Sequence, residues 1–177
     1  MLPDVIRTGR LVLRPWSVDD AGHVFLYAND VEWSRYLRIA QPYSLGDASK
    51  FIATQLLLSR LEHPSWAIEY EGCVVGGINL RLLSDLRIGV LGYSIARAVW
   101  GRGLATAALI DLTQYAFSTL TELNRLFAYV DEHHVASIRV LEKARFRREG
   151  HLIGAAIKRG RIHNQFVYAL TRTEARP

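Results

Sequence analysis

The sequence predicts an α/β fold with a mixed sheet, formed by a single domain over residues 1–177. Three runs with strand character follow one another between residues 66 and 96, and the short turns between them indicate an antiparallel meander. A helix and a further strand come next, in the order of a strand-helix-strand crossover. No internal repeat or low-complexity linker divides the chain.

The first predicted strand covers residues 11–15, where polar and apolar positions alternate in LVLRP. A largely helical region follows to about Leu61, with Ser17 placed to cap its start and an interruption near residues 41–43. Ser44 and Asp47 resemble a capping box and predict the start of a second helix.

The meander is predicted from WAIEY, CVVGGINLRLL and RIGVLGYSIA, with a turn at Glu71-Gly72 and a break at Ser84-Asp85. The elements predicted after it are a helix from residue 104 to about 116, a strand over 125–131, a helix that Ser137 opens toward Phe146, and a closing hairpin of residues 151–158 and 164–170.

Composition restricts the function classes. Half of the 177 residues are apolar, yet no uncharged apolar run is long enough to span a membrane, and the amino terminus carries charges where a signal peptide needs an apolar run. A soluble, cytoplasmic protein is expected. The one cysteine, Cys73, excludes an intramolecular disulfide and a multi-cysteine metal site, and is expected to be a small buried thiol.

The charge balance favours anionic partners. The chain has 22 Lys and Arg against 17 Asp and Glu, a net charge of +5. Two basic clusters, residues 145–148 and 158–161, raise the alternative of nucleic-acid binding. No zinc-finger spacing, basic zipper or RNA-recognition signature accompanies them, so solvated arginines are the preferred interpretation.

The segment from Leu91 to Leu109 carries the clearest chemical signal. Gly101 and Gly103 stand just before a helix, where the first backbone N–H groups lack partners and the helix dipole is positive. Glycines let a phosphate approach the backbone closely, and Arg102 adds a positive charge. The segment matches neither a Walker loop nor a dinucleotide fingerprint. From these residues alone, a phosphate site and a plain helix start remain open.

At these residues the chain resembles the GCN5-related N-acetyltransferase (GNAT) superfamily, whose acetyl-CoA loop reads Q/R-x-x-G-x-G/A. The sequence GYSI followed by WGRGLATAA is similar to the branch that contains the ribosomal-protein-alanine N-acetyltransferases. The opening GRLVLRP, the segment SIRVLEK and the terminal FVYAL resemble that branch too, so the similarity spans nearly the whole chain.

The resemblance implies a sheet, mostly antiparallel, that splays between a central parallel pair of strands ending near Ile95 and Asp131, with helices flanking it. It also implies acetyl-CoA as co-substrate, with the pantetheine arm along the strand edge and the pyrophosphate on the glycine loop. The cofactor-binding residues so implied are Ser94, Ile95, Ala96, Gly101, Arg102, Gly103, Leu104, Ala105 and Thr106.

Direct attack of an amine on the thioester needs a proton acceptor, an oxyanion donor and a proton for the leaving sulfur. Ser137, aligned with the family's serine, is the candidate proton donor, although a helix-capping role is the alternative. Glu69 and His134 are the candidate bases, with Asp131 and Glu132 as further options. A backbone N–H near residue 95 is expected to stabilise the oxyanion. No metal site is expected.

Several positions depart from the family's pattern. Ala107 stands where the family has glutamate, His134 where it has asparagine, Arg145 where it has glycine, and Asn164 where it has an acid. Trp100 replaces the leading Gln or Arg of the loop. These departures concern acceptor identity and proton transfer, and leave the glycines intact.

The resulting hypothesis is an N-acetyltransferase that acts on a primary amine, with the N-terminal amine of a ribosomal or other protein as one acceptor. The alternatives are a small-molecule acceptor, such as a polyamine or an antibiotic, and a CoA-binding regulatory module without turnover. The sequence leaves open the acceptor, the general base, and whether the chain is monomeric or dimeric.

Overall fold

The computed structural model describes residues 2–83 and 87–175. The predicted break at Ser84-Asp85 lies outside the described residues. The elements, in chain order, are β1 (Ile6–Thr8), β2 (Leu11–Arg14), the 3-10 turn η1 (Val18–Asp20), α1 (Ala21–Ala28), η2 (Trp33–Tyr36), α2 (Leu45–Leu57), β3 (Ser65–Tyr70), β4 (Cys73–Leu83), β5 (Ile88–Ile95), η4 (Arg97–Val99), α3 (Leu104–Thr119), β6 (Arg125–Asp131), α4 (Val135–Lys143), β7 (Arg147–Lys158), β8 (Arg161–Thr171) and α5 (Arg172–Ala175).

The described strands form one eight-stranded sheet in the order β1-β2-β3-β4-β5-β6-β8-β7. Its neighbouring strands pair antiparallel except for β5 and β6, which are parallel. The predicted meander is β3, β4 and β5, the crossover runs through α3, and the predicted hairpin is β7 and β8. The predicted α/β fold with a mixed, mostly antiparallel sheet is therefore confirmed.

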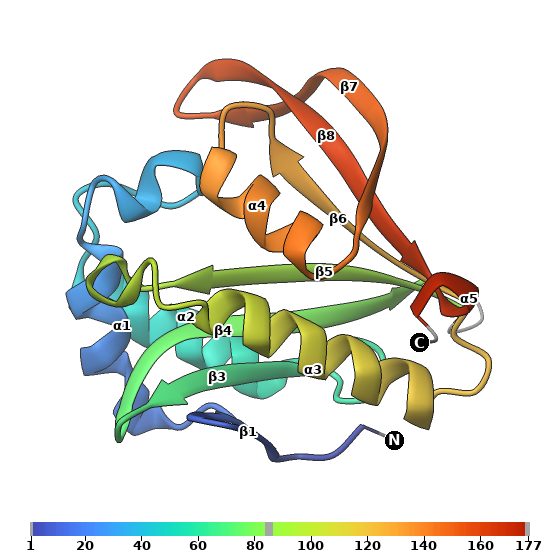
Figure 1. The fold of residues 1–177 in the computed structure, drawn as a ribbon. Coiled ribbons are helices and arrows are strands. Elements are labelled where there is room, and N and C mark those ends of the chain that lie inside the picture. Colours follow the sequence, from blue (N-terminus) through green and yellow to red (C-terminus); the bar gives the residue numbers. More distant parts are fainter. Residues whose placement is uncertain (1, 84–86, 176–177) are drawn as a thin grey trace.

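The sheet opens at the parallel pair. β5 and β6 pair only over three residues each, 88–90 with 125–127, although β5 continues to Ile95 and β6 to Asp131. Beyond this short ladder the strands diverge, and β6 rises away from β5 together with β7 and β8 (Figure 1). The predicted splay is confirmed, and it leaves the edge of β5 from residue 91 onward unpaired with β6.

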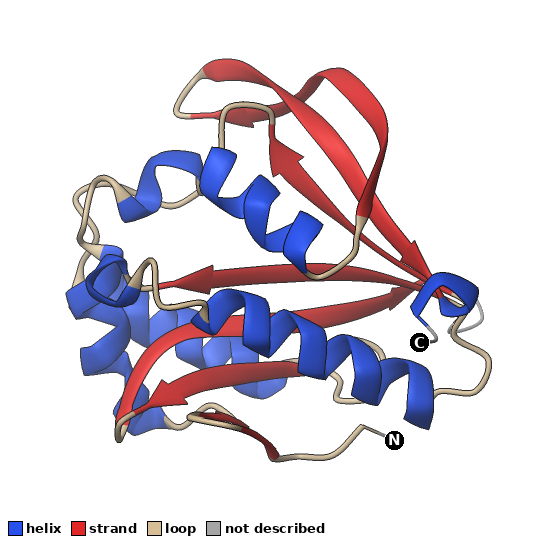
Figure 2. Cartoon of the chain, in the orientation of Figure 1, coloured by secondary structure: helices blue, strands red, loops and turns tan. Residues whose placement is uncertain are grey.

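Helices cover both faces of the sheet. α3 and α4 lie in front of it and α1 and α2 lie behind it in the view of Figures 1 and 2. The alternation of strand residues accounts for this arrangement. Trp66 and Ile68 of β3 belong to the core that α3 covers, whereas Ala67 between them packs with Trp16 and the α1–α2 layer.

The local predictions hold for most elements. The predicted face of α3, residues 104, 108, 112 and 116, is fully buried. Ser44 and Asp47 form the predicted capping box of α2, and Ser17 caps η1 in the same way. Among the described residues, no helix is both long and apolar enough to cross a bilayer.

Three local predictions differ from the structure. The predicted interruption near residues 41–43 is longer than expected, since turns and the short η2 occupy residues 29–44 between α1 and α2. Cys73 is exposed, since it begins β4 directly after the tight turn at Glu71-Gly72. Ser137 does not open α4: the helix begins at Val135, with His134 as its cap.

Candidate functional site

Two cavities meet where β5 and β6 diverge. The first, which we call the loop cavity, has a volume of about 330 Å³ and extends from the start of α3 to α4. The second, which we call the aromatic cavity, has a volume of about 400 Å³ and lies between the α1–α2 layer and β4, β5 and β6. The residues that line both are Trp33, Leu37, Tyr93, Ser94 and Ser137.

The glycine loop has the geometry of an anion site. Gly101 and Gly103 adopt φ values of 77° and 76°, a left-handed conformation that other residues rarely adopt. Beyond the two adjacent residues, no described heavy atom lies within 4 Å of the position that a Cβ would take at either glycine. The first helical N–H groups, at residues 104–106, have no intrahelical partner because the ladder begins with the Ala107 N–H bonding to the Gly103 carbonyl.

The loop cavity brings most of the predicted cofactor residues together. Those that line it are Ser94, Ile95, Gly101, Gly103, Leu104, Ala105 and Thr106. Arg102 and Ala96 are not part of this lining. Ala96 is buried, and its N–H donates to the Val75 carbonyl at 2.6 Å.

The backbone of residue 95 faces the open edge of β5. Adjacent strand residues direct their backbone groups to opposite edges, and the Ala96 N–H points to β4, so the Ile95 groups point toward β6. The indole Nε1 of Trp100 donates to the Ile95 carbonyl oxygen at 2.7 Å. This bond ties the glycine loop to β5 and leaves the Ile95 N–H directed into the gap.

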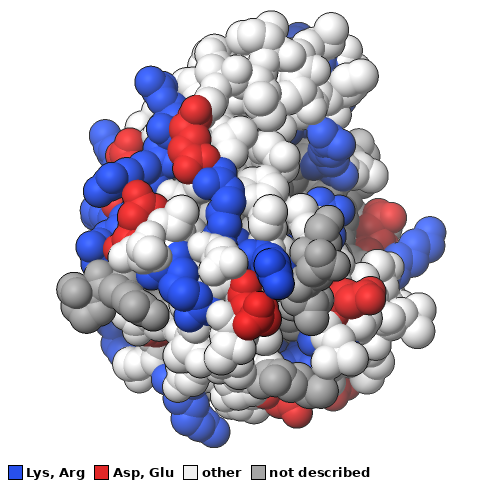
Figure 3. Space-filling model, turned by 90° about the vertical axis from the view of Figure 1, so that its right-hand side faces the viewer, with Lys and Arg blue, Asp and Glu red and all other residues white. Residues whose placement is uncertain are grey.

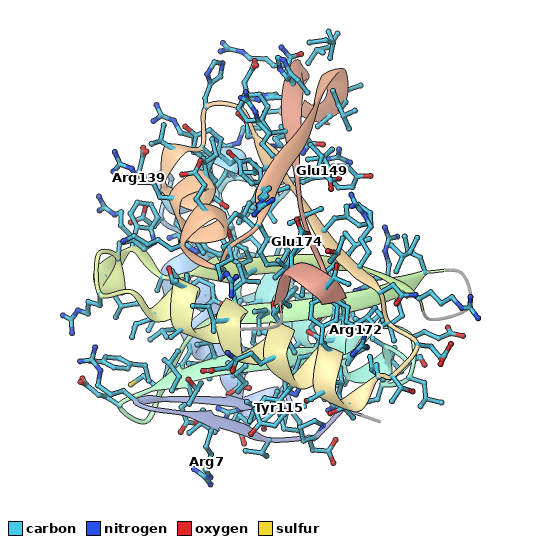
Figure 4. The ribbon with its side chains drawn as sticks, turned by 45° about the vertical axis from the view of Figure 1, so that its right-hand side comes forward. Arg7, Tyr115, Arg139, Glu149, Arg172 and Glu174 are labelled. Carbon is cyan, nitrogen blue, oxygen red and sulfur yellow. The ribbon has the colours of Figure 1, made fainter. Side chains whose placement is uncertain are left out.

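Two cations of the site were not predicted from the sequence. Arg139 and Lys143 line the loop cavity from α4. They stand four residues apart, which places them on the same face of the helix. This four-residue spacing is the sequence signal from which both cations could have been predicted. Arg139 extends from α4 on the side away from Glu149 and Glu174 (Figure 4).

The hydroxyl groups of Tyr93 and Ser137 lie 2.9 Å apart, and the Tyr93 hydroxyl is also within 3.1 Å of the Ser137 carbonyl oxygen. Burial raises the pKa of the Tyr93 hydroxyl above its usual range. Tyr93 is therefore a neutral hydrogen-bond donor at neutral pH. It can donate to Ser137 while the Ser137 proton points toward the cavities.

His134 lies next to Ser137 in a capping role. Its Nδ1 accepts a hydrogen bond from the Ser137 N–H at 3.4 Å, and its ring stacks on Tyr36 at 4.3 Å between ring centres. Burial lowers the pKa of His134, although the nearby Asp131 opposes this. The neutral ring uses its one acceptor nitrogen for the cap, so this geometry favours a positioning role over that of a base.

The structure places the carboxylate candidates elsewhere. Glu69 lines neither cavity; its carboxylate accepts from Arg14 at 2.7 Å. Asp131 is buried and pairs with Lys158 at 3.0 Å and with His163 at 2.7 Å. Glu69 and Asp131 are therefore both held in ion pairs, and neither lines a cavity. This geometry does not support the predicted base role of Glu69.

Glu132 and Asn164 form a separate polar cluster. The Glu132 carboxylate accepts from Asn164 at 2.9 Å and lies 2.7 Å from His151. The side-chain oxygen Oδ1 of Asn164 accepts from the Gly154 N–H in the irregular part of β7. These contacts hold the hairpin in place, and neither residue lines a cavity.

Three side chains of the two basic clusters are engaged within the chain. Lys158 is buried against Asp131, Arg159 donates to the Ser34 hydroxyl at 2.9 Å, and Arg147 pairs with Glu174. On the face drawn in Figure 3, basic and acidic side chains are interspersed rather than separated. These internal contacts favour the interpretation of the clusters as individual structural or solvated side chains over a nucleic-acid surface.

Comparisons with known proteins agree with this geometry. A family model described as the acetyltransferase (GNAT) domain matches residues 10–147. The uncharacterized N-acetyltransferase p20 of Bacillus licheniformis is 28% identical over 177 residues, which cover 97% of this chain and 98% of that protein.

Solved structures share the fold. Mycobacterium smegmatis RimJ, in complex with a CoA disulfide, has a TM-score of 0.83 at 23% identity and covers 96% of this chain and 87% of its own. RimL, a ribosomal L7/L12 alpha-N-protein acetyltransferase in complex with coenzyme A, has a TM-score of 0.82 at 17% identity, with 94% and 97% covered. The chain is an N-acetyltransferase that belongs to the GNAT family.

Proposed function

We propose that this chain transfers the acetyl group of acetyl-CoA to a primary amine by direct attack, with both substrates bound at once. The observation that carries the proposal is the meeting of the two cavities at Tyr93, Ser94 and Ser137. One cavity begins at a glycine loop suited to a pyrophosphate, and the other opens on the acceptor side. Two substrates held there would meet without a covalent enzyme intermediate.

Most of the predicted cofactor contacts would fit this arrangement. The N–H groups of residues 104–106 would bind the pyrophosphate, and Arg139 and Lys143 would add positive charge on the opposite wall. The open edge of β5 near Ile95 would pair with the amides of the pantetheine arm. When bound, acetyl-CoA supplies the thioester whose acetyl group is transferred.

Two groups of the chain would stabilise the charges that develop during acetyl transfer. The Ile95 N–H points into the gap and would donate to the developing oxyanion. The Ser137 hydroxyl, held by Tyr93, would donate its proton to the departing sulfur. Neither cavity lining, as far as the structure describes it, contains an Asp or Glu. The amine proton would therefore leave through water rather than to a carboxylate.

The acceptor class stays open between a protein N-terminal amine and a small molecule. The fold shared with RimL supports the first, and the ring-lined aromatic cavity supports the second. In either case we propose that the whole chain acts as one acetyltransferase domain in the cytoplasm.

Initial-rate kinetics of thiol release test the mechanism. With acetyl-CoA and an amine varied together, direct transfer predicts intersecting double-reciprocal lines. Parallel lines would indicate a covalent acetyl-enzyme and contradict the proposal. Binding of acetyl-CoA without thiol release across a broad amine panel would instead favour the regulatory module.

A further inference from the structure

The aromatic cavity is built from fixed rings. Trp16 and Phe51 pack edge to face with centroids 5.2 Å apart, and Tyr27 packs against Trp33 at 5.0 Å. The indole Nε1 of Trp16 donates to the Ser65 hydroxyl at 3.0 Å, so its polar atom is already paired. The walls therefore offer apolar ring surface to a ligand.

The absence of a side chain at Gly77 of β4 leaves space for the Trp16 indole in the cavity wall. A Cβ at residue 77 would lie 2.6 Å from Cζ2 of Trp16, a separation that real atoms do not show. The indole thus packs directly on the strand backbone, beside Gly77. The ring cannot move toward β4, and this fixes one boundary of the cavity.

The charged side chains around the aromatic cavity also bear on which ligand it can bind. Arg38 is the one charged side chain in its described lining, and no ion pair or hydrogen bond joins Arg38 to another described residue. The acids of the neighbouring segment are occupied: Asp30 pairs with Arg97 at 2.7 Å and Glu32 pairs with Arg35 at 3.0 Å.

This charge pattern separates classes of amine. A polyamine or an aminoglycoside keeps further ammonium groups beside the reacting amine, and a carboxylate is the strongest partner that a cavity can offer to each of them. The described lining holds no carboxylate, and its guanidinium would repel such groups. The same guanidinium would pair with a carboxylate of the acceptor.

We propose, on the basis of the function proposed above, that the acceptor is a free α-amino acid with an aromatic side chain. Its ring would lie among Trp16, Phe51 and Trp33, its carboxylate would pair with Arg38, and its amine would reach the junction at Ser137. The amine nitrogen bonds to the acetyl carbon while the carbon–sulfur bond breaks. The amine loses one proton to water and the thiolate gains one, which yields the N-acetyl amino acid and CoA.

The test compares kcat/KM for thiol release with four acceptors: tryptophan, tryptamine, a dipeptide with N-terminal tryptophan, and spermidine. Tryptophan is expected to exceed tryptamine, which lacks the carboxylate, by about tenfold or more, in line with a charge-assisted hydrogen bond. Spermidine is expected to be the poorest acceptor. Phenylalanine should behave as tryptophan does.

Arg38→Gln should reduce the tryptophan-to-tryptamine ratio by about tenfold, because it removes the cation but keeps a side chain of similar length. Arg35→Gln is the matched control: Arg35 belongs to the same segment, pairs with Glu32 and lines neither cavity. It should leave the ratio unchanged.

Three results would overturn this acceptor assignment while leaving the acetyltransferase function intact: faster turnover of spermidine, faster turnover of the dipeptide, which would identify a protein N-terminus, or an unchanged ratio in Arg38→Gln. Binding of acetyl-CoA without turnover of tryptophan or phenylalanine would overturn it too. Failure to bind acetyl-CoA is a different result and would contradict the proposed function itself.

Discussion

The hydroxyl oxygens of Tyr93 and Ser137 lie 2.9 Å apart where the two cavities meet. Tyr93 comes from β5 and Ser137 from α4, so this contact links β5 to the helix that follows β6 where the sheet splays. The pair therefore connects the architecture of the GNAT fold with the proposed proton donation to the leaving sulfur.

Ser137→Ala should lower kcat by about 100-fold while leaving the affinity for acetyl-CoA unchanged, because the hydroxyl acts only when the sulfur departs. Steady-state kinetics and a binding titration on the same preparation measure both. Ser118→Ala removes an exposed hydroxyl on α3 and should affect neither. A wild-type rate for Ser137→Ala would assign the hydroxyl a purely structural role.

The free energy of unfolding should depend on pH through the protonation of His134. Its folded pKa is lowered from the ordinary value of 6.5, mainly by burial, so below about pH 6.5 the unfolded chain binds more protons than the folded one. The free energy of unfolding should therefore fall as the pH drops below about 6.5, with no contribution from this group at higher pH. Urea unfolding at pH 8, 6 and 5 measures this dependence.

Two variants distinguish the helix-capping contribution of His134 to stability from its pH-dependent contribution. His134→Ala should cost about 1 kcal/mol at pH 8, since the Ser137 N–H loses its acceptor. His134→Asn offers an amide oxygen to the same N–H and should lose less stability between pH 8 and 5 than the wild type. An identical pH dependence in this variant would show that His134 does not contribute to it.

Arg145→Gly should stabilise the protein by about 0.5 kcal/mol. Arg145 ends α4 with φ at 68°, and the Phe146 N–H bonds to the Leu141 carbonyl in the manner of a left-handed helix end. Thermal or urea unfolding measures the change. Arg145→Ala removes the same charge but keeps a Cβ at positive φ, so a gain as large as that of the glycine variant would refute the backbone explanation.

The pH dependence of kcat/KM should follow the acceptor's own amine, because the described cavity linings contain no carboxylate to serve as a base. The rate should rise with pH toward the pKa of the amine. With a second amine of lower pKa, the rise should move to lower pH by the same difference. A rise that stays at one pH for both amines would reveal a titrating group of the enzyme.

Much of the fold follows from local signals in the sequence. The meander, the α3 face and the capping box at Ser44 each depend on neighbours within a few residues, and they appear as predicted. β1 was missed because a strand of three residues at the sheet edge carries too few positions to show alternation. β7 begins at Arg147, earlier than residue 151, because its first half is exposed and polar.

Less of the candidate site than of the fold could be predicted from the sequence. The glycine loop could be recognised because its residues are contiguous, but the junction at Tyr93 and Ser137 joins residues 44 positions apart. Glu69 was a reasonable base by residue type, yet its pairing with Arg14 depends on the packing of β2 beside β3. Such pairings are decided by tertiary structure rather than by local pattern.

Calorimetric titration of acetyl-CoA, with NAD as the control ligand, tests the central claim most directly. We expect micromolar binding that is selective for acetyl-CoA, and at least tenfold weaker binding in Gly103→Val, which strains the loop and places a side chain in the loop cavity. Gly160→Val imposes similar strain at φ 72° in the β7–β8 turn and should bind as the wild type does. Absence of binding, or equal affinity in Gly103→Val, would contradict the assignment of this loop to the cofactor.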